Sequence, residues 1–260
     1  MERDGKYIYC IIASDHDSNF GPIGIGDRGD LVTTIGFDGL CMVVSDHSLS
    51  DIAVNPKNIL AHQKVIEEVM KEFNSILPLS FGNIAATPDE IRNLLSGRYR
   101  EFMELLRTFE NMVEINVKCT WKNIDTIFKE IEQDNAAFKK IKQDLKKESD
   151  LSIKNKKRAE AGKMVQEELH KKNKNEAESM MNAFKRATYD YRQNKITSDA
   201  MFFNTAFLMN SGREKEIDNI ISDIGEEYKD RIDFSYTGPM PIFNFIDLKI
   251  FPEKWETLGL

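Results

Sequence analysis

The chain has 260 residues, of which 41% are hydrophobic and 30% are charged, with 14 glycines and seven prolines. This composition is typical of a folded globular protein and excludes a collagen-like, mucin-like or wholly disordered chain. The formal net charge of -7 disfavours a protein that binds nucleic-acid phosphates through a basic face. The length predicts one large domain or two modest ones.

No apolar run reaches the ~18–20 residues of a membrane-spanning helix, so we expect no membrane span. The start of the chain lacks the long apolar segment and cleavage site of a secretory signal. Three cysteines, Cys10, Cys41 and Cys119, stand far apart in apolar surroundings. They are typical of buried thiols in a reducing cytosol, and we therefore expect a cytoplasmic protein.

The first third of the chain is rich in strand patterns. An apolar run over residues 7–12 predicts a strand, and a polar, glycine-rich stretch follows it. Two further strand patterns, 31–35 and 40–45, flank Asp38-Gly39, which predicts a hairpin with a tight turn.

Two helices are predicted in the remainder of this region. Periodicity from Pro56 onward places His62 on an apolar face, which favours a buried, hydrogen-bonded histidine over a general base. Residues 76–82 predict an extended segment. A second helix is predicted from Thr87 to Phe109, because Thr-Pro-Asp-Glu combines a capping box with proline at the first helical position.

A second strand-and-helix region is predicted to start with a strand over residues 113–121. Apolar and polar residues alternate along it, so Glu114, Asn116 and Lys118 are expected on a solvent-facing side. A helix led by Asp125 and ending near Phe138 is predicted next.

The stretch from Lys139 to Glu178 carries 13 Lys and Arg against eight Asp and Glu, a net charge of +5. It predicts two charged helices joined near residues 148–150, with the second continuing to Tyr191. Two interpretations stay open: a projecting hairpin or coiled-coil arm, and a solvated helix face with a narrow core stripe. Lysine alternates with glutamate here and aromatic residues are absent, so no base-stacking platform for nucleic acid is present.

The rest of the chain predicts a strand over 200–209, a helix over 216–228 and a strand over 231–236, followed by a tail without periodicity. We therefore expect an α+β fold with two sheet-plus-helix domains. The predicted parts are an N-terminal domain (1–111), a C-terminal ferredoxin-like domain (112–237) with its helical arm (about 139–195), and a tail (238–260). The second domain is one strand short, or has one strand hidden in the tail.

No group of residues points to catalysis. Residues 24–29 match G-x-G-x-x-G, but a strand pattern and not a helix follows them, which favours a plain loop. Asp15-His16-Asp17 and Asp46-His47 lack a further metal ligand at useful spacing. We expect no catalytic residue, no bound metal and no cofactor.

Several motifs carry a resemblance to a known family. The most specific is Tyr-Thr-Gly-Pro-Met-Pro-Ile-Phe-Asn-Phe at 236–245, which resembles the signature Y-T-G-P-W-P-P-Y-x-F, with Met240, Ile242 and Phe243 as departures. Leu-Pro-Leu-Ser-Phe-Gly at 77–82 is a second, with Ser80 where arginine is common. Over essentially its full length the chain resembles the gas vesicle accessory proteins of the L/F type (GvpL/GvpF). The structural signature residues are His62, Pro78, Phe81, Gly82, Gly238, Pro239 and Pro241.

The resemblance implies a non-enzymatic assembly factor, cytoplasmic and associated with gas vesicles. Such a factor is expected to bind the hydrophobic main shell protein (GvpA) and other gas vesicle accessory proteins. The alternative is a minor structural component of the vesicle shell. Free shell monomers expose apolar surface, so aromatic and apolar anchors are the expected contacts. The candidate partner-binding residues are Glu114, Asn116 and Lys118 on the strand, and Phe251, Trp255 and Leu260 in the tail.

Overall fold

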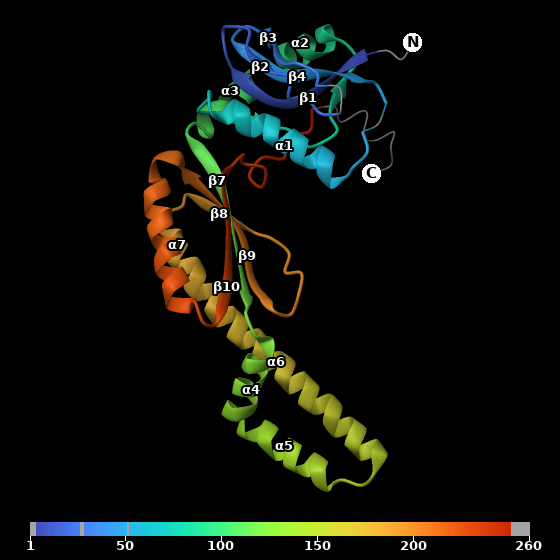
Figure 1. Ribbon diagram of the computed structural model, residues 1–260, viewed down its shortest axis with the longest axis vertical. Coiled ribbons are helices and arrows are strands. Elements are labelled where there is room, and N and C mark those ends of the chain that lie inside the picture. Colours follow the sequence, from blue (N-terminus) through green and yellow to red (C-terminus); the bar gives the residue numbers. More distant parts are fainter. Residues whose placement is uncertain (1–3, 27–28, 51, 251–260) are drawn as a thin grey trace. The chain divides into compact units, whose positions relative to one another are not determined.

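The structure is a computed structural model that describes residues 4–26, 29–50 and 52–250 (Figure 1). Contacts divide the chain into two compact units. Unit 1 comprises the chain up to Glu114, the short segment Leu208–Gly212 and the chain from Gly238 onward, and unit 2 comprises Ile115–Phe207 and Arg213–Thr237. The segment predicted as a separate tail therefore belongs to unit 1, where Leu248 and Ile250 are buried in a core cluster.

Unit 1 is built on a six-stranded sheet. Its strands are β1 (Asp4–Ala13), β2 (Asn19–Gly21), β3 (Val32–Phe37), β4 (Leu40–Ser48), β5 (Ile76–Pro78) and β6 (Ile84–Ala85). The strand order is β2-β3-β4-β1-β5, and β6 also pairs with β1. Phe37 pairs with Leu40 across the turn, where Asp38 and Gly39 both have positive φ. The predicted tight hairpin is thus confirmed.

Strand β1 is buried on both of its faces. Its register against β4 shifts between Ile8 and Cys10, which marks a β-bulge. Because of the bulge, the neighbours Tyr9 and Cys10 belong to one core cluster, whereas Ile8 and Ile11 belong to the other. The unbroken apolar run of the sequence is therefore explained by a central strand with helices on both sides.

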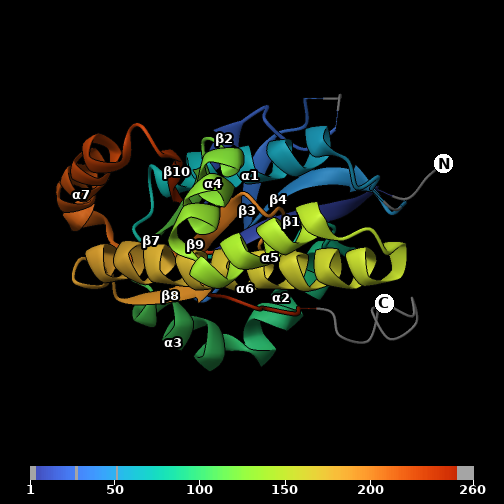
Figure 2. The same ribbon diagram turned by 90° about the horizontal axis from the view of Figure 1, so that it is seen from below.

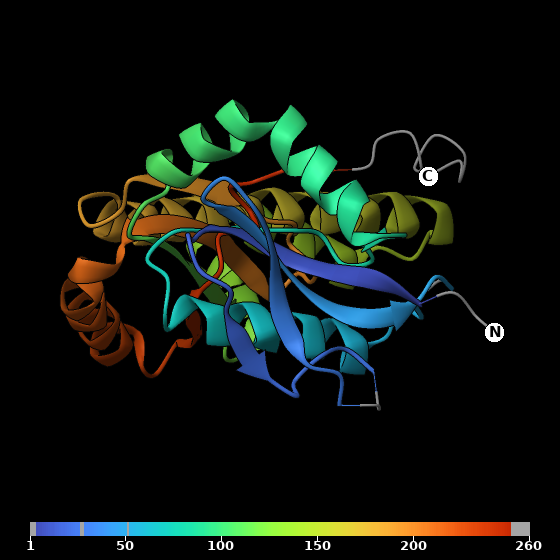
Figure 3. The ribbon, with the colours of Figure 1, turned by 90° about the horizontal axis from the view of Figure 1, so that it is seen from above.

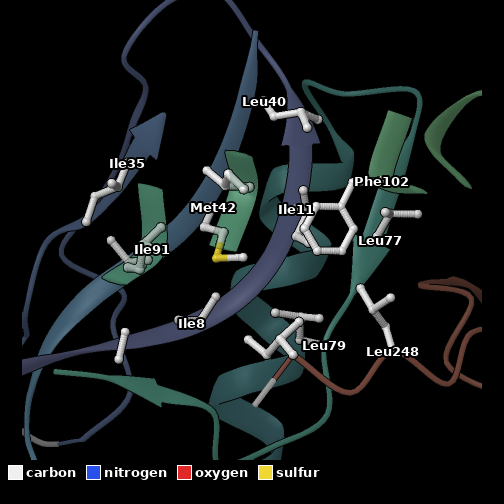
Figure 4. Close-up of a cluster of buried hydrophobic side chains, with 14 of the residues drawn as sticks. Ile8, Ile11, Ile35, Leu40, Met42, Leu77, Leu79, Ile91, Phe102 and Leu248 are labelled. Carbon is white, nitrogen blue, oxygen red and sulfur yellow. The ribbon is translucent and has the colours of Figure 1, made fainter. Parts of the chain in front are cut away.

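The helices of unit 1 are α1 (Pro56–Met70), α2 (Pro88–Gly97) and α3 (Tyr99–Thr108). Figure 3 shows α1 on one face of the sheet and α2 with α3 on the other. Figure 4 shows the core on the α2–α3 side, where Ile11, Met42 and Phe102 lie together.

The prediction of a single helix from Thr87 to Phe109 is wrong, because the structure has two helices in this range. Thr87 caps α2 as predicted, its hydroxyl oxygen accepting from the Glu90 backbone N–H. At Arg98 the backbone leaves the helical region, with φ -115° and ψ 22°. This break gives α2 and α3 different directions, so that each buries its own apolar face, with Ile91 on α2 and Phe102 on α3.

Unit 2 contains most of a four-stranded sheet made of β7 (Met112–Trp121), β8 (Asp190–Gln193), β9 (Met201–Asn210) and β10 (Ile232–Met240). The strand order is β10-β7-β9-β8. Its helices are α4 (Ile124–Asp134), α5 (Ala136–Lys147), α6 (Leu151–Lys185) and α7 (Glu214–Tyr228), with a short 3-10 turn at Ser211–Arg213. Along the chain the order is strand, helices, strand, strand, helix, strand, which is the β-α-β-β-α-β pattern.

Three expectations about unit 2 are corrected. The strand missing from the sequence pattern is β8, directly after α6, and not a strand in the tail. Tyr191, predicted on a helix, lies on β8, since α6 already ends at Lys185 and the following aromatic and β-branched residues favour a strand. Strand β10 also runs to Met240, beyond the predicted end of the strand at residue 236.

Helices α5 and α6, which we call the arm, lie side by side as a hairpin (Figures 1 and 2). The helix predicted to end near Phe138 is instead divided at Asn135, whose extended backbone ends α4 and whose side chain caps α5. Near the sheet, α6 buries Met180, Met181 and Phe184, and the Phe184 ring stacks on Phe207 at 5.0 Å. No residue from 139 to 168 is buried.

Candidate partner-binding surfaces

The signature residues of the N-terminal region gather around His62. His62 Nε2 lies 3.0 Å from the Leu79 carbonyl oxygen, and Nδ1 lies 2.8 Å from Tyr7 Oη. Because a carbonyl can only accept, Nε2 donates, and the neutral ring accepts the Tyr7 hydroxyl proton at Nδ1. Tyr7 Oη in turn accepts from the Gly82 backbone N–H at 3.1 Å. This chain of bonds ties α1 to β1 and to the loop after β5.

Burial keeps this network neutral. It lowers the pKa of His62 to about 4, against the opposing effect of the Leu79 carbonyl. Burial also raises the pKa of Tyr7, and it raises the pKa of Tyr9 to about 12. Both nitrogens of His62 are engaged and only 3% of the residue is exposed. The predicted buried, hydrogen-bonded histidine is confirmed.

Three other signature residues surround this network through their backbone or ring. Pro78 ends β5, a strand at the edge of the sheet order, where the missing N–H of proline is tolerated. Gly82 has φ +97°, a conformation that favours glycine. The Phe81 ring lies 5.9 Å from the His62 ring. These residues shape the loop that carries the Gly82 N–H to Tyr7.

The C-terminal signature reaches the same network. Gly238 and Pro239, joined by a cis peptide bond, lie near the end of β10. Pro241 helps to line a small cavity of about 80 Å³ in unit 1. Further along, the Phe243 ring lies 6.3 Å from the ring of His62. The sequence analysis did not foresee this contact, because no local pattern connects two positions so distant along the chain.

Glu114 was expected on a solvent-facing side, and this prediction is wrong. Its side chain is fully buried, and its carboxylate accepts from the Asn244 backbone N–H at 2.8 Å and from Asn244 Nδ2 at 2.6 Å. Glu114 therefore holds the C-terminal segment in unit 1. The alternation of polar and apolar residues along the strand could not reveal that Glu114 has a buried partner, because Asn244 is distant in sequence.

The other candidate contact residues fall into two groups. Along β7, Asn116 is half-buried and Lys118 is exposed, so only Lys118 keeps the expected open position. Phe251, Trp255 and Leu260 lie outside the described residues. Of the described candidates, Lys118 is therefore the one that stays available to a partner in the expected way.

Exposed apolar side chains are concentrated in two short segments of the chain. In unit 1, a group that we call the α1 patch occupies the link from β4 and the start of α1; its members are Leu49, Ile59, Leu60 and Val54, exposed by 43%, 42%, 63% and 79%. In unit 2, Leu151 and Ile153 are exposed at the start of α6. The helical periodicity from Pro56 onward includes Ile59 in the apolar face of α1, but its exposure shows that the buried part of this face begins only at His62.

The remaining motifs carry no site in the described residues. The glycines at 24–29 precede β3 and not a helix, and the Gly24 N–H donates to the Asp30 carbonyl oxygen; Asp27 and Arg28 within the motif lie outside the described residues. Within the described part of the chain, no group of three or more His, Cys, Asp or Glu side chains could hold a metal ion. The three cysteines are free and buried, and burial raises the pKa of Cys10.

None of the described helices has an apolar stretch long enough to cross a bilayer.

Comparisons with known proteins agree along nearly the whole chain. It is 26% identical over 255 residues to gas vesicle protein F1 of Halobacterium salinarum, covering 97% of this chain and 98% of that protein. It is 24% identical to gas vesicle protein F of Haloferax mediterranei, covering 95% of each chain. The crystal structure of GvpF from Anabaena sp. PCC7120 matches the fold with a TM-score of 0.81 at 19% identity, covering 95% of this chain and 99% of that one.

The family model described as gas vesicle synthesis protein GvpL/GvpF matches residues 5–247. This range includes β1 except for its first residue, the His62 network, the arm and the C-terminal signature with Asn244. The chain belongs to the GvpL/GvpF family of gas vesicle synthesis proteins.

Proposed function

We propose that this chain is a non-enzymatic assembly factor of the cytoplasm that binds the hydrophobic main shell protein (GvpA) and other accessory proteins at the growing gas vesicle. Membership of a family of gas vesicle synthesis proteins places the chain in vesicle formation. The observation that supports the binding step is the α1 patch, whose most exposed member, Val54, is exposed by 79%.

The α1 patch differs from the ordinary apolar surface of a protein. Single exposed apolar residues are common and need no explanation. Here four large aliphatic side chains are exposed between residues 49 and 60, whereas the next turns of α1 bury His62 and Val65 in the core. Exposed apolar side chains concentrated in one short segment favour a contact site over scattered surface residues.

Such a patch suits a partner whose own apolar surface is covered only in the finished assembly. A free shell monomer would expose that surface to water and aggregate. Contact with the α1 patch would remove apolar area from both proteins, at about 25 cal/mol per Å² of area buried. A site of a few aliphatic side chains would bind weakly enough to release the monomer to the growing shell.

Co-expression of GvpA with the full-length chain tests this proposal. We expect the wild-type chain to keep GvpA in the soluble fraction and to co-purify with it, and V54S/L60S to capture several-fold less. L31S is the matched control, because Leu31 is a 54% exposed apolar residue of unit 1 outside the patch. Failure of the wild-type chain to capture GvpA would overturn the proposal, and equal capture by V54S/L60S would exclude the patch as the contact.

The alternative, a minor structural component of the shell, makes a different prediction. It requires the chain to stay in washed, purified vesicles at a fixed ratio to GvpA. An assembly factor is expected in the lysate and lost on washing.

A further inference from the structure

The tip of the arm combines exposed apolar and basic side chains. We define the tip as the last two residues of α5, Lys146 and Lys147, the loop 148–150 and the start of α6 from Leu151 to Arg158. Leu151 is 76% exposed and Ile153 is 44% exposed, at the first turn of a 35-residue helix. Nothing within the described residues buries them.

The carboxylates of the tip form their hydrogen bonds and ion pair with other groups of the tip. Glu148 accepts from the Asp150 backbone N–H and pairs with Lys157 at 3.2 Å. Asp150 caps α6 by accepting from the backbone N–H groups of Ser152 and Ile153 at 2.8 and 3.2 Å. Both acidic side chains are therefore held by the turn and are poorly placed to neutralise the surrounding cations.

The cations of the tip and of α5 are mostly unpaired. Lys142 pairs with Glu132 and Lys157 pairs with Glu148. Within the described part of the chain no ion pair is formed by Lys139, Lys140, Lys146, Lys147, Lys154, Lys156 or Arg158. The tip is thus a positively charged surface on a chain whose net charge is -7.

Helix stability does not explain this arrangement. The amino end of α6 has its favoured carboxylate at the cap, Asp150, whereas Lys154, Lys156 and Arg158 lie beyond the first turn and gain nothing from the helix dipole. Lys146 and Lys147, at the carboxyl end of α5, are favourably placed. The helix ends therefore explain neither the cations of α6 nor the two exposed aliphatic side chains beside them, and this combination indicates a functional surface.

We propose that the tip of the arm docks an acidic, amphipathic helix of a partner protein. Because residues two positions apart on a helix point to different sides, Leu151, the more exposed of the two, supplies the main apolar anchor for the stripe of such a helix, and Ile153 adds a flanking contact. The unpaired cations of the tip attract the carboxylates of the partner. The arm has no aromatic residue between Phe138 and Phe184, which disfavours single-stranded nucleic acid as the occupant. The identification of this partner as a gas vesicle protein rests on the proposed function, whereas the binding chemistry does not.

A synthetic peptide tests the chemistry directly. The probe is a fluorescein-labelled helical peptide of ~18 residues with a leucine stripe flanked by glutamates, and its anisotropy is measured with the full-length chain. We expect saturable binding that weakens between ~0.05 and ~0.5 M NaCl, because the cations are exposed. A peptide with lysine in place of glutamate should not bind, and one with serine in place of leucine should bind at least ~10-fold more weakly.

Matched variants locate the site. K146E/K147E and L151S/I153S should each weaken binding of the glutamate peptide at least ~10-fold. K171E/K174E is the control, because it changes the net charge equally at two exposed lysines further along α6. Absence of binding by the wild-type chain, or equal loss in the control, would overturn the proposal. Circular dichroism confirms that each variant keeps the helical content of the wild-type chain.

A second measurement tests whether the tip binds an anionic membrane surface in place of a protein helix. Stronger binding to anionic phosphatidylglycerol vesicles than to the glutamate peptide, with the same dependence on Lys146 and Lys147, would also overturn it. The test is independent of shell-protein capture: we expect K146E/K147E to hold GvpA in solution as well as the wild-type chain does. Loss of peptide binding with GvpA capture intact therefore separates this inference from the proposed function.

Discussion

Strand β1 of unit 1 and the arm of unit 2 differ most clearly in the interactions that stabilise them. Every residue of β1 from Tyr7 to Ile12 has an exposed fraction of 0%, and the polar Tyr7 is satisfied by His62 and Gly82. In the arm, no residue from 139 to 168 is buried. The strand is stabilised by packing against residues distant in sequence, whereas the arm is stabilised by helix caps, surface ion pairs and the contact between α5 and α6.

This difference determines where substitutions should matter. A buried side chain contributes its transfer free energy and also prevents a cavity, so truncating it is costly. An exposed arm residue contributes little to global unfolding, and regions with few buried contacts open locally at low free-energy cost. The arm can therefore carry residues selected for binding without much effect on stability.

The largest effect is expected for F102A in unit 1. Phe102 is 0% exposed and lies in the core between α3 and the sheet (Figure 4). Removing the ring should lower the free energy of unfolding by about 3–5 kcal/mol, measured by urea denaturation. I153A in the arm is the matched truncation and should change it by less than about 0.5 kcal/mol. Similar losses in both variants would contradict the contrast between the two regions.

The same contrast explains which parts of the fold the sequence could predict. The Asp38-Gly39 hairpin and the Thr87 cap are recognisable because each depends on residues adjacent in sequence. The apolar face of α1 is recognisable because its period is local, and it correctly predicted a buried His62. The family motif at 236–245 was also recognisable, since a motif needs no knowledge of packing.

The features of the fold that the sequence could not predict depend on tertiary contacts. The break at Arg98 follows from fitting two helices to one sheet face, and Gly97 just before it is only a weak local sign of a helix end. The four-residue β8 is too short and too exposed to show alternation, and it exists because it pairs with β9. Glu114 looked solvent-facing by alternation, yet Asn244, from the far end of the chain, covers it. Apolar residues exposed at the first turn of a helix look like core residues in any periodic pattern.

The second prediction concerns the pH dependence of unit 1. The pKa of His62 is about 4 in the folded chain and 6.5 when unperturbed, so between these values the unfolded chain binds a proton that the folded chain does not. Stability from this residue is therefore fully present above pH ~6.5 and falls as the pH is lowered towards 4, by about 3 kcal/mol in total. Urea denaturation at a series of pH values measures the slope.

H62N should flatten this part of the pH profile, because asparagine does not titrate. N93A is the control, since Asn93 is exposed on α2 and has no titratable group, and it should leave the slope unchanged. A wild-type profile that is flat between pH 4 and 6.5, or an unchanged slope in H62N, would contradict the buried, uncharged state of His62 that the geometry indicates.

The third prediction concerns the cap at the tip of the arm. Asp150 accepts two backbone N–H groups at the start of α6, so D150A should cost about 1 kcal/mol of local helix stability. We expect faster amide hydrogen exchange in the first turns of α6, with protection of β1 unchanged. D150N is the conservative control, because asparagine also caps helices well. Loss of protection in β1 as well would show that the arm and unit 1 unfold together.

The smallest effect on stability is expected for L151S/I153S, although the same variant should lose binding to the glutamate peptide. Leu151 is 76% exposed, so replacing it removes little buried area, and the free energy of unfolding should change by less than about 0.5 kcal/mol. Serine would even relieve the exposure of two apolar side chains to water. A loss above about 1 kcal/mol would show that both residues are structural, because only a packed side chain can cost so much. Unchanged stability combined with lost binding would mean that α6 keeps apolar residues at its start for a partner and not for its own fold.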